Sequence, residues 1–184
     1  MTATIKEAKI EDVEKGLLEV YIEGYRFHQN GRPDVFKNLS DDELKQELIS
    51  DFEKFKIIEI LKDERIIGYL AYEFKGKRVL KLHVDQLVIK EDSRKKGYGK
   101  ILMEKVKDIA KENNCNMIVL DCWTFNTNAM AMYEHIGFDR QRILYEMKIW
   151  TKGITLLFIF LICNINSTKT SLKRLVLYDI MELC

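Results

Sequence analysis

The stretch VIKEDSRKKGYGKILMEKV, which runs from Val88 to Val106, decides the fold. An apolar, strand-like run gives way to a charged loop, and Gly97 and Gly99 stand where a helix-like pattern begins. Glycines at such a junction let backbone N–H groups converge without clashes from Cβ atoms. Converging N–H groups at the positive end of a helix dipole bind phosphate or pyrophosphate. The segment therefore predicts an anion cradle, to which four cations add charge: Arg94, Lys95, Lys96 and Lys100.

A solvated basic turn is the alternative interpretation of this loop. The segment is not a Walker loop, because the pattern Gly-x-x-x-x-Gly-Lys-Ser/Thr is absent. It is not a dinucleotide fingerprint either, since no third glycine stands three residues after Gly99. Taken alone, the loop does not separate the two interpretations.

The strand before the loop, VLKLHVDQLVI, changes phase near its middle. Leu80, Leu82 and Val84 alternate, but Gln86 stands where the next apolar residue belongs, and the apolar set resumes at Leu87. A slip of one residue predicts a β-bulge, which frees backbone groups from the ladder. A strand that ends near residue 85, or one that is buried on both faces near its end, would give the same pattern.

Outward from this stretch, the periodicities predict an α/β protein with a mixed sheet and helices packed on it. Ser40 followed by Glu43 is a capping box that starts a second helix. The residues around Arg26–Asn38 contain the only proline and are expected to form a loop. The expected order is a strand over 4–8, a helix from 10, a helix from 40, strands over 55–61, 66–74 and 79–89, a helix over 99–112, a short buried strand over 117–121, a helix over 126–136 and a last strand over 142–149.

Composition narrows the class of protein. The chain has 184 residues, of which 47% are hydrophobic, and this suits one globular domain with an appendage. The net charge of +1 gives no general attraction to nucleic acid or to an anionic membrane, so no nucleic-acid partner is expected. The N-terminus has no apolar core of signal-peptide length, which predicts a cytoplasmic protein. The four cysteines form no Cys-x-x-Cys pair and have no histidine at ligand spacing, so no metal is expected.

The tail, residues 150–184, is set apart from the predicted domain, residues 1–149. Its run ITLLFIFLICNI has twelve residues without a charge, which is too short to span a bilayer comfortably. The run could be an extra strand, a surface helix, or a strand exchanged with a second copy in a homodimer. Its bias toward Ile, Leu, Phe, Asn and Lys would also fit translated A/T-rich sequence beyond an ancestral stop.

Two motifs together resemble the GNAT superfamily of N-acetyltransferases. Arg94–Gly99 matches the family pattern Arg/Gln-x-x-Gly-x-Gly/Ala. The segment NTNAMAMYEHIGF matches a second family element, Asn-x-x-Ala-x-x-x-Tyr-x-x-x-Gly-Phe. Its matching residues are Asn126, Ala129, Tyr133, Gly137 and Phe138. A helix and a strand separate the two motifs, as the family requires, and the resemblance covers roughly residues 1–149.

The resemblance implies the GNAT-like acyl-CoA N-acyltransferase fold and an enzyme that uses acetyl-CoA. The glycine loop, from Arg94 through Tyr98 to Lys100, would wrap the pyrophosphate. The pantetheine arm would lie in a splay between the parallel strands that end near Ile89 and Asp121. The bulged strand would offer backbone groups of Leu87, Val88 and Ile89 to the arm and the thioester carbonyl. The helix that carries Asn126, Ala129 and Tyr133 would complete the acetyl-CoA site.

The resemblance also implies catalytic roles. Tyr133 would give a proton or a hydrogen bond to the leaving thiolate, although it could simply pack on the inner face of its helix. The amine must be neutral to attack, so a base or a water chain takes its proton. His83 and Asp85 are candidates for the base, but Asp85 could instead bind a cationic acceptor and His83 could be a neutral residue that faces solvent.

The acceptor amine is expected to bind between the first helices and the QNGRPDVF loop. Its class stays open among a small amine, a peptide N-terminus, a lysine side chain and an aminoglycoside. A second function from a different class is an acyl-CoA-binding sensor or interaction module with no useful turnover, because a fold does not determine a function.

Overall fold

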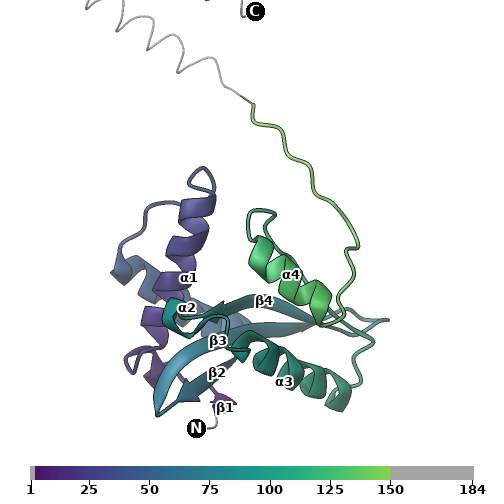
Figure 1. Cartoon of the computed structure of the whole chain (residues 1–184), viewed down its shortest axis with the longest axis horizontal. Helices are drawn as coiled ribbons and strands as arrows, with labels where there is room; N and C mark the ends of the chain where they lie inside the picture. Colours follow the sequence, from purple (N-terminus) through teal and green to yellow (C-terminus); the bar gives the residue numbers. More distant parts are fainter. Residues whose placement is uncertain (1–2, 150–184) are drawn as a thin grey trace, which may run out of the picture. The chain divides into compact units, whose positions relative to one another are not determined.

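In the part of the chain that the structure describes, five strands form one sheet and lie side by side in chain order (Figure 1). The computed structural model describes residues 3–149. The strands are β1 (Thr4–Glu7), β2 (Lys56–Lys62), β3 (Arg65–Lys75), β4 (Lys81–Ile89) and β5 (Met117–Leu120). The first four strands pair antiparallel, whereas β4 and β5 pair parallel. The mixed sheet predicted from the sequence is therefore confirmed.

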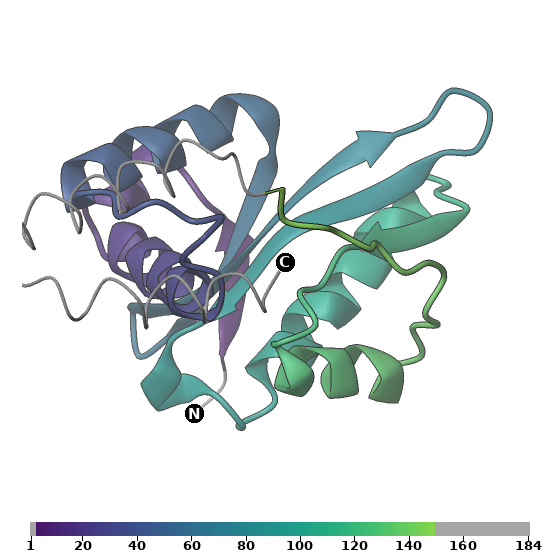
Figure 2. The same ribbon diagram turned by 90° about the horizontal axis from the view of Figure 1, so that it is seen from above.

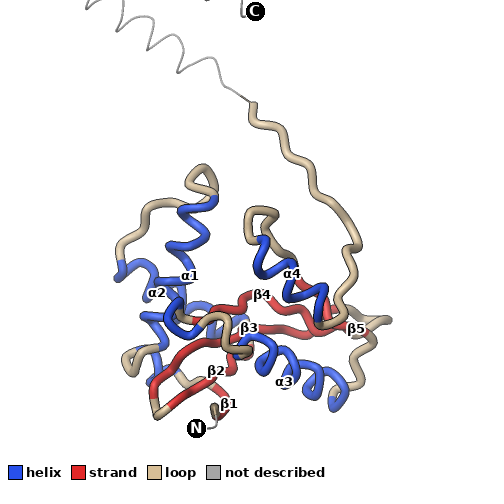
Figure 3. Tube along the Cα trace, in the orientation of Figure 1, coloured by secondary structure: helices blue, strands red, loops and turns tan. Residues whose placement is uncertain are grey.

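Helices cover both faces of the sheet (Figure 2). The short 3₁₀ helix η1 (Ile10–Val13), α1 (Leu17–Gly31) and α2 (Asp41–Lys54) lie on one face, with core residues such as Leu17, Val20 and Leu44. The helices α3 (Tyr98–Glu112) and α4 (Thr127–His135) lie on the other face. A second 3₁₀ turn, η2 (Glu91–Ser93), precedes α3. Figure 3 shows the strands in red and the helices in blue.

The first helix differs from the sequence-based expectation at both ends. The expected helix from Ile10 is interrupted at Gly16, whose φ of +118° is a left-handed conformation that glycine adopts without a Cβ penalty. At its other end α1 continues to Gly31, so Arg26–Gly31 are helical rather than part of a loop. Proline at position 33 ends the helix only two residues later. The longer helix carries its last turn toward the loop after β5.

Two local predictions in this half of the chain are confirmed. The Ser40 hydroxyl accepts from the Glu43 N–H, and the Glu43 carboxylate accepts from the Ser40 N–H, which completes the capping box of α2. Asp63 and Glu64 have φ of +50° and +63°, as in the two-residue hairpin turns whose twist matches paired strands. They join β2 to β3 as the hairpin predicted from the sequence.

The phase slip in β4 is a β-bulge. Ala71 of β3 pairs with Gln86 and Tyr72 pairs with Val84, so Asp85 is the extra residue on the bulged strand. β4 continues to Ile89, and the alternative of a strand that ends near residue 85 is wrong. The extra residue lets Val84 and Leu87 both pack toward α3, although they are three positions apart. An apolar core face is therefore kept on both sides of the bulge.

β5 is less buried than the sequence indicated. Its residues are partly exposed, and the Met117 side chain is largely so. In the described residues β5 pairs only with β4, so it forms an edge of the sheet. An edge strand lacks the second neighbour that would bury it from the side.

The chain divides into two compact units, residues 1–139 and residues 140–184. Of the second unit the structure describes residues 140–149, which contain neither a helix nor a strand. The strand predicted over 142–149 is therefore wrong for these residues, and its apolar side chains, such as Leu144 and Tyr145, are exposed. A strand needs a partner for its backbone hydrogen bonds, and alternation of apolar residues does not supply one. The predictions for the tail lie outside the described residues.

Over residues 3–149, no helix combines the length with the apolar composition that crossing a bilayer requires.

Candidate active site

The parallel strands β4 and β5 separate where the bulge begins. Their pairing runs from Lys81 with Met117 to Val84 with Leu120, and it stops there. β4 continues for five more residues to Ile89, whereas β5 ends at Leu120. Beyond Val84, the backbone N–H and C=O groups on the β5 side of β4 therefore have no hydrogen-bond partners in β5. The predicted splay and the predicted residues Leu87, Val88 and Ile89 lie at this opening.

Two sides of the splay are lined by different elements. Val88 is buried against α1, where Gly24 leaves so little room that a Cβ would lie 2.8 Å from a Val88 methyl carbon. Leu87 and Ile89 instead belong to the core beneath α3 and α4. Because side chains alternate across the strand, this part of β4 contacts both helical layers.

The glycine loop turns sharply into α3. Lys95 and Gly97 have φ of +60° and +84°, and a Cβ added at Gly97 would meet nothing within 4 Å. The regular bonding of α3 begins where the Ile101 N–H donates to the Gly97 carbonyl at 3.1 Å. The first N–H groups of a helix have no acceptor within it, so those of Tyr98, Gly99 and Lys100 remain available at the positive end of the dipole. Open space beside free N–H groups fits a phosphate.

Gly99 has a second role in this turn. A Cβ at this position would lie 3.0 Å from the Met132 sulfur of α4. The glycine therefore lets the start of α3 approach α4 closely. The two glycines of the motif thus have different roles, Gly97 in the backbone conformation and Gly99 in the packing against α4.

The four cations of the loop are not equivalent. The exposed side chains of Lys95 and Lys100 stand next to the turn. Lys96 Nζ donates to the Asp92 carbonyl at 2.6 Å, within the loop. Arg94 Nε donates to the Ile89 carbonyl at 2.9 Å, and its Nη2 donates to Glu23 of α1 at 2.8 Å. The Arg94 guanidinium is thus bound within the protein.

Tyr133 lies on α4, where its ring packs against Phe138 with 5.8 Å between the ring centroids. Burial is the main cause that raises the pKa of its hydroxyl well above the usual range, and the nearby Cys122 thiol adds to the rise. The hydroxyl is therefore protonated at neutral pH and can donate a hydrogen bond, while its raised pKa makes it a weaker acid than an exposed phenol. Asn126 caps the same helix by accepting from the Ala129 N–H at 3.3 Å. The cap fixes where the helix begins and hence where Tyr133 stands.

His83 lies among charged side chains on β4. Its Nε2 is 3.7 Å from an Asp121 carboxylate oxygen, and its Nδ1 is 3.8 Å from a Glu73 carboxylate oxygen. Lys75 Nζ is 3.4 Å from the same Nδ1. Only 15% of the side chain is exposed, so the alternative that His83 faces solvent does not describe it.

Asp85 differs from His83 in its surroundings. It is the exposed residue of the bulge, two positions before Leu87. The next side chain, Gln86, turns toward α2, where Asp51 Oδ2 accepts from its Nε2 at 2.9 Å. Burial is the main cause that raises the pKa of the Asp51 carboxyl, and the negative charge of Asp85 also contributes. Two carboxylates therefore stand on the α2 side of the bulge.

An aromatic cluster on the same side of the sheet was not predicted. It joins α1, the loop after it and the loop after β5, and its members are Phe27, His28, Phe36, Trp123 and Phe125. A Cβ at Gly31 would lie 2.4 Å from the Phe125 ring, so the glycine makes room for the cluster. The Arg32 guanidinium lies 4.8 Å from the centroid of the Trp123 ring. The QNGRPDVF segment thus contacts the loop after β5, and the sequence signal for this was the Trp-Thr-Phe triplet after the strand.

Within residues 3–149, no group of three or more His, Cys, Asp or Glu side chains is arranged to hold a metal ion.

The chain is similar in sequence to a known protein family. A family model described as the acetyltransferase (GNAT) family matches residues 17–138, which contain the splay, the glycine loop and Tyr133. The human protein N-acetyltransferase 8 is 24% identical over 104 residues, which are 56% of this chain and 45% of the human protein. The chain thus matches less than half the length of that relative.

Solved structures show the same fold. The BH1408 protein from Bacillus halodurans, solved as a tetramutant, superposes with a TM-score of 0.69 and 20% identity, covering 79% of this chain and 99% of that one. Ribosomal-protein-alanine N-acetyltransferase from Brucella melitensis superposes with a TM-score of 0.62 and 18% identity, covering 80% and 100%. At these identities the likeness concerns the fold alone.

Proposed function

Because this chain belongs to the GNAT family of acetyltransferases, we propose that it transfers the acetyl group of acetyl-CoA to an amine by direct attack. One observation carries the proposal. The opening between β4 and β5 beyond Val84 leads to the turn at Gly97, where α3 begins. An extended arm fits the first feature and a pyrophosphate fits the second.

The chain's own residues would hold acetyl-CoA in two ways. Backbone groups of Leu87, Val88 and Ile89 would bond the arm where the β5 ladder is absent. The N–H groups at the start of α3, with Lys95 and Lys100, would bind the pyrophosphate. Acetyl-CoA supplies a thioester when bound, and holding an amine against it can contribute about 7–11 kcal/mol to lowering the barrier. Orientation by these residues is therefore the largest catalytic effect in this proposal.

Two side chains would assist the transfer. The Tyr133 hydroxyl is protonated at neutral pH, so it would donate a hydrogen bond that stabilises the departing thiolate, although burial raises its pKa and makes it a weaker acid. His83 is our choice for the base, since an imidazole is intrinsically a stronger base than a carboxylate. His83 stands four residues before Leu87, about 10–13 Å along a strand, so the proton would pass through water. Asp85, which is closer and exposed, would instead attract the cationic form of the acceptor.

The acceptor would approach on the α1 and α2 side of the sheet. The aromatic cluster and Asp85 both lie there, which suits an amine attached to an apolar or planar group. A ribosomal-protein alanine is named as the acceptor of the Brucella neighbour, and such a peptide amine is one candidate beside small amines, lysine side chains and aminoglycosides. The acceptor class is therefore the first question for experiment.

A thiol-release assay tests the proposed function. The full chain is incubated with acetyl-CoA and a panel of amines from the four classes, and free thiol is measured over time. Release that depends on one class of amine supports an acetyltransferase and names its acceptor. Binding of acetyl-CoA without release on every amine would instead support the acyl-CoA sensor. A chain that does not bind acetyl-CoA at all would contradict both.

A further inference from the structure

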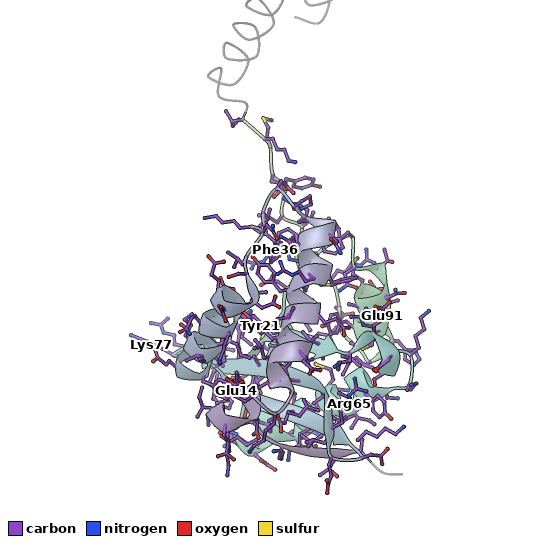
Figure 4. The ribbon with its side chains drawn as sticks, turned by 90° about the vertical axis from the view of Figure 1, so that its left-hand side faces the viewer. Glu14, Tyr21, Phe36, Arg65, Lys77 and Glu91 are labelled. Carbon is purple, nitrogen blue, oxygen red and sulfur yellow. The ribbon has the colours of Figure 1, made fainter. Side chains whose placement is uncertain are left out.

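We propose that Glu23 of α1 is a positioning residue for the glycine loop, and that Arg94 acts as its partner rather than as a ligand of the phosphate. The inference rests on the proposed function, because it concerns how the acetyl-CoA site is held. Neither residue need touch acetyl-CoA for its affinity to depend on them. Figure 4 looks onto α1, and the labelled Glu91 marks the loop that the helix contacts.

Glu23 joins two donors from the loop on one oxygen. Its Oε1 accepts from the Glu91 N–H at 2.6 Å and from Arg94 Nη2 at 2.8 Å. Only 29% of the Glu23 side chain is exposed. Hydrogen bonds in which one partner is charged are stronger than neutral ones. A single carboxylate on α1 therefore holds both ends of the turn η2, before and after Asp92 and Ser93.

Arg94 is engaged on three sides by these surroundings. Its Nε donates to the carbonyl of Ile89, the last residue of β4, and its Nη2 donates to Glu23. Its guanidinium also lies 5.6 Å from the centroid of the Phe27 ring, one turn further along α1. The charge is directed at the strand and the helix rather than at the turn around Gly97. Arg94 thus links β4, α1 and the loop.

Asp92 collects several side-chain contacts of the loop, from Lys96, from Ser93 and from Arg65 of β3, but the backbone of the loop has only two turn hydrogen bonds before α3. The Ser93 N–H donates to the Lys90 carbonyl at 2.9 Å, and the Arg94 N–H donates to the Glu91 carbonyl at 3.2 Å. The next residue, Lys95, is in the left-handed region, which only a few non-glycine residues adopt. Without Glu23 the loop would be freer to relax, and the N–H groups at the start of α3 would no longer be held ready for a phosphate.

A double-mutant cycle on the full chain tests this inference. Acetyl-CoA binding is measured by calorimetry for Glu23→Gln, Arg94→Gln and the double variant. We expect each single change to weaken binding by about tenfold, and the double variant to be no weaker than either. Arg94→Lys should not restore affinity, because an ammonium keeps the charge but cannot make both bonds. Once an acceptor is known, steady-state kinetics of the single variants should show a raised KM for acetyl-CoA. Their kcat at saturating acetyl-CoA should stay near the wild-type value.

Glu19→Gln is the matched control. Glu19 lies one turn earlier on the same helix, and Lys90 Nζ donates to its carboxylate at 2.7 Å, so it ties α1 to the residue between β4 and η2 without contacting the Glu91 N–H or Arg94. An equal loss of affinity in Glu19→Gln would overturn the inference in favour of general docking of α1. Additive losses at Glu23 and Arg94, or full rescue by Arg94→Lys, would overturn it in favour of a direct phosphate ligand. If the wild-type chain does not bind acetyl-CoA, the proposed function itself fails; if it binds and Glu23→Gln binds equally well, only this inference fails.

Discussion

The hydroxyl of the fully buried Tyr69 donates a 2.5 Å hydrogen bond to Oε1 of Gln86, the residue that follows the bulge. The amide of Gln86 in turn donates to Asp51 of α2. An aspartate carboxylate only accepts, so the amide nitrogen must face Asp51 and the oxygen must face Tyr69. The side chain after the bulge is therefore bonded to a central strand and to a helix, and it holds β4 where the splay opens.

The first prediction follows from this bond. Gln86→Leu should lower the midpoint of thermal unfolding by roughly 3–12 °C, because it leaves the Tyr69 hydroxyl and the Asp51 carboxylate buried without their partner. Tyr69→Phe should have a smaller effect, since it removes only the hydroxyl. The double variant should be less destabilised than the sum of the two, as expected for residues that share a bond. Strict additivity in thermal melts followed by circular dichroism would show that the two side chains act independently.

The sequence predicted the bulge, but it could not predict the hydrogen bonds from Tyr69 and to Asp51 that hold Gln86 beside it. The slip at Gln86 appears in the apolar pattern because side chains alternate along one strand. Tyr69 and Asp51 are 17 and 35 residues away in the sequence, and their approach to Gln86 depends on strand register and on where α2 lies. The same limit applies to Glu23 and Arg94. Local periodicity contains no information about which polar side chains meet after folding.

The segment 142–149 is a case in which local periodicity predicts an element that the structure lacks. Ile143, Tyr145, Met147 and Ile149 alternate as a strand would, yet the structure has no strand there. The glycine motif is a contrasting case, since both its turn and its helix depend on neighbouring residues and were predicted correctly. Predictions from the sequence succeed where the structure-forming bonds are local and fail where a partner must be supplied.

Gly97→Glu tests the cradle. We expect acetyl-CoA affinity to fall at least tenfold, about 1.4 kcal/mol, because the change adds a carboxylate to the open space and strains a φ of +84°. Gly16→Glu is the control, since Gly16 also has a positive φ and open surroundings but lies outside the loop. Both variants should lose some stability, and only Gly97→Glu should lose binding in calorimetry. Equal binding by the two variants would remove the cradle from the proposal.

Tyr133→Phe tests the proton donor. The change keeps the ring and its packing on Phe138, so acetyl-CoA affinity should stay near the wild-type value while kcat falls by roughly 10- to 1000-fold. Tyr72→Phe is the control, because Tyr72 is buried in the same core beneath α3 and has a pKa raised by burial. Steady-state kinetics with the acceptor found in the panel would measure both. Turnover in Tyr133→Phe that equals that of Tyr72→Phe would leave Tyr133 a packing residue.

His83→Gln and Asp85→Asn separate the two candidates for the base. A base must be deprotonated to act, so its pKa limits the rate on the acid side of the pH profile of kcat/KM. We expect His83→Gln to lower kcat by about 10²- to 10⁴-fold and to remove that limb. Asp85→Asn should mainly raise KM for a cationic acceptor. If neither variant shifts the acid limb, the proton is taken up by water or by another group.

His28 should make the stability of the protein depend on pH. Its Nδ1 lies 2.9 Å from the Gly24 carbonyl, its ring stacks on Phe36 at 5.5 Å, and burial lowers the pKa of the imidazole. The unfolded state binds a proton below a pH of about 6.5, whereas the folded state binds it only at lower pH. Stability should therefore fall as the pH drops from about 6.5 toward the lowered pKa.

His28→Phe keeps a ring in the aromatic cluster and removes the titration. Urea unfolding at pH 7.5 and pH 5.5 should show a smaller loss of stability on acidification in this variant than in the wild-type chain. His135→Gln, at an exposed position on α4, controls for the loss of one histidine. An acid loss that is the same in His28→Phe as in the wild type would mean that His28 takes up its proton in the folded state as readily as in the unfolded one. The aromatic cluster would then be open to water, and it could not provide a water-free apolar surface for the acceptor.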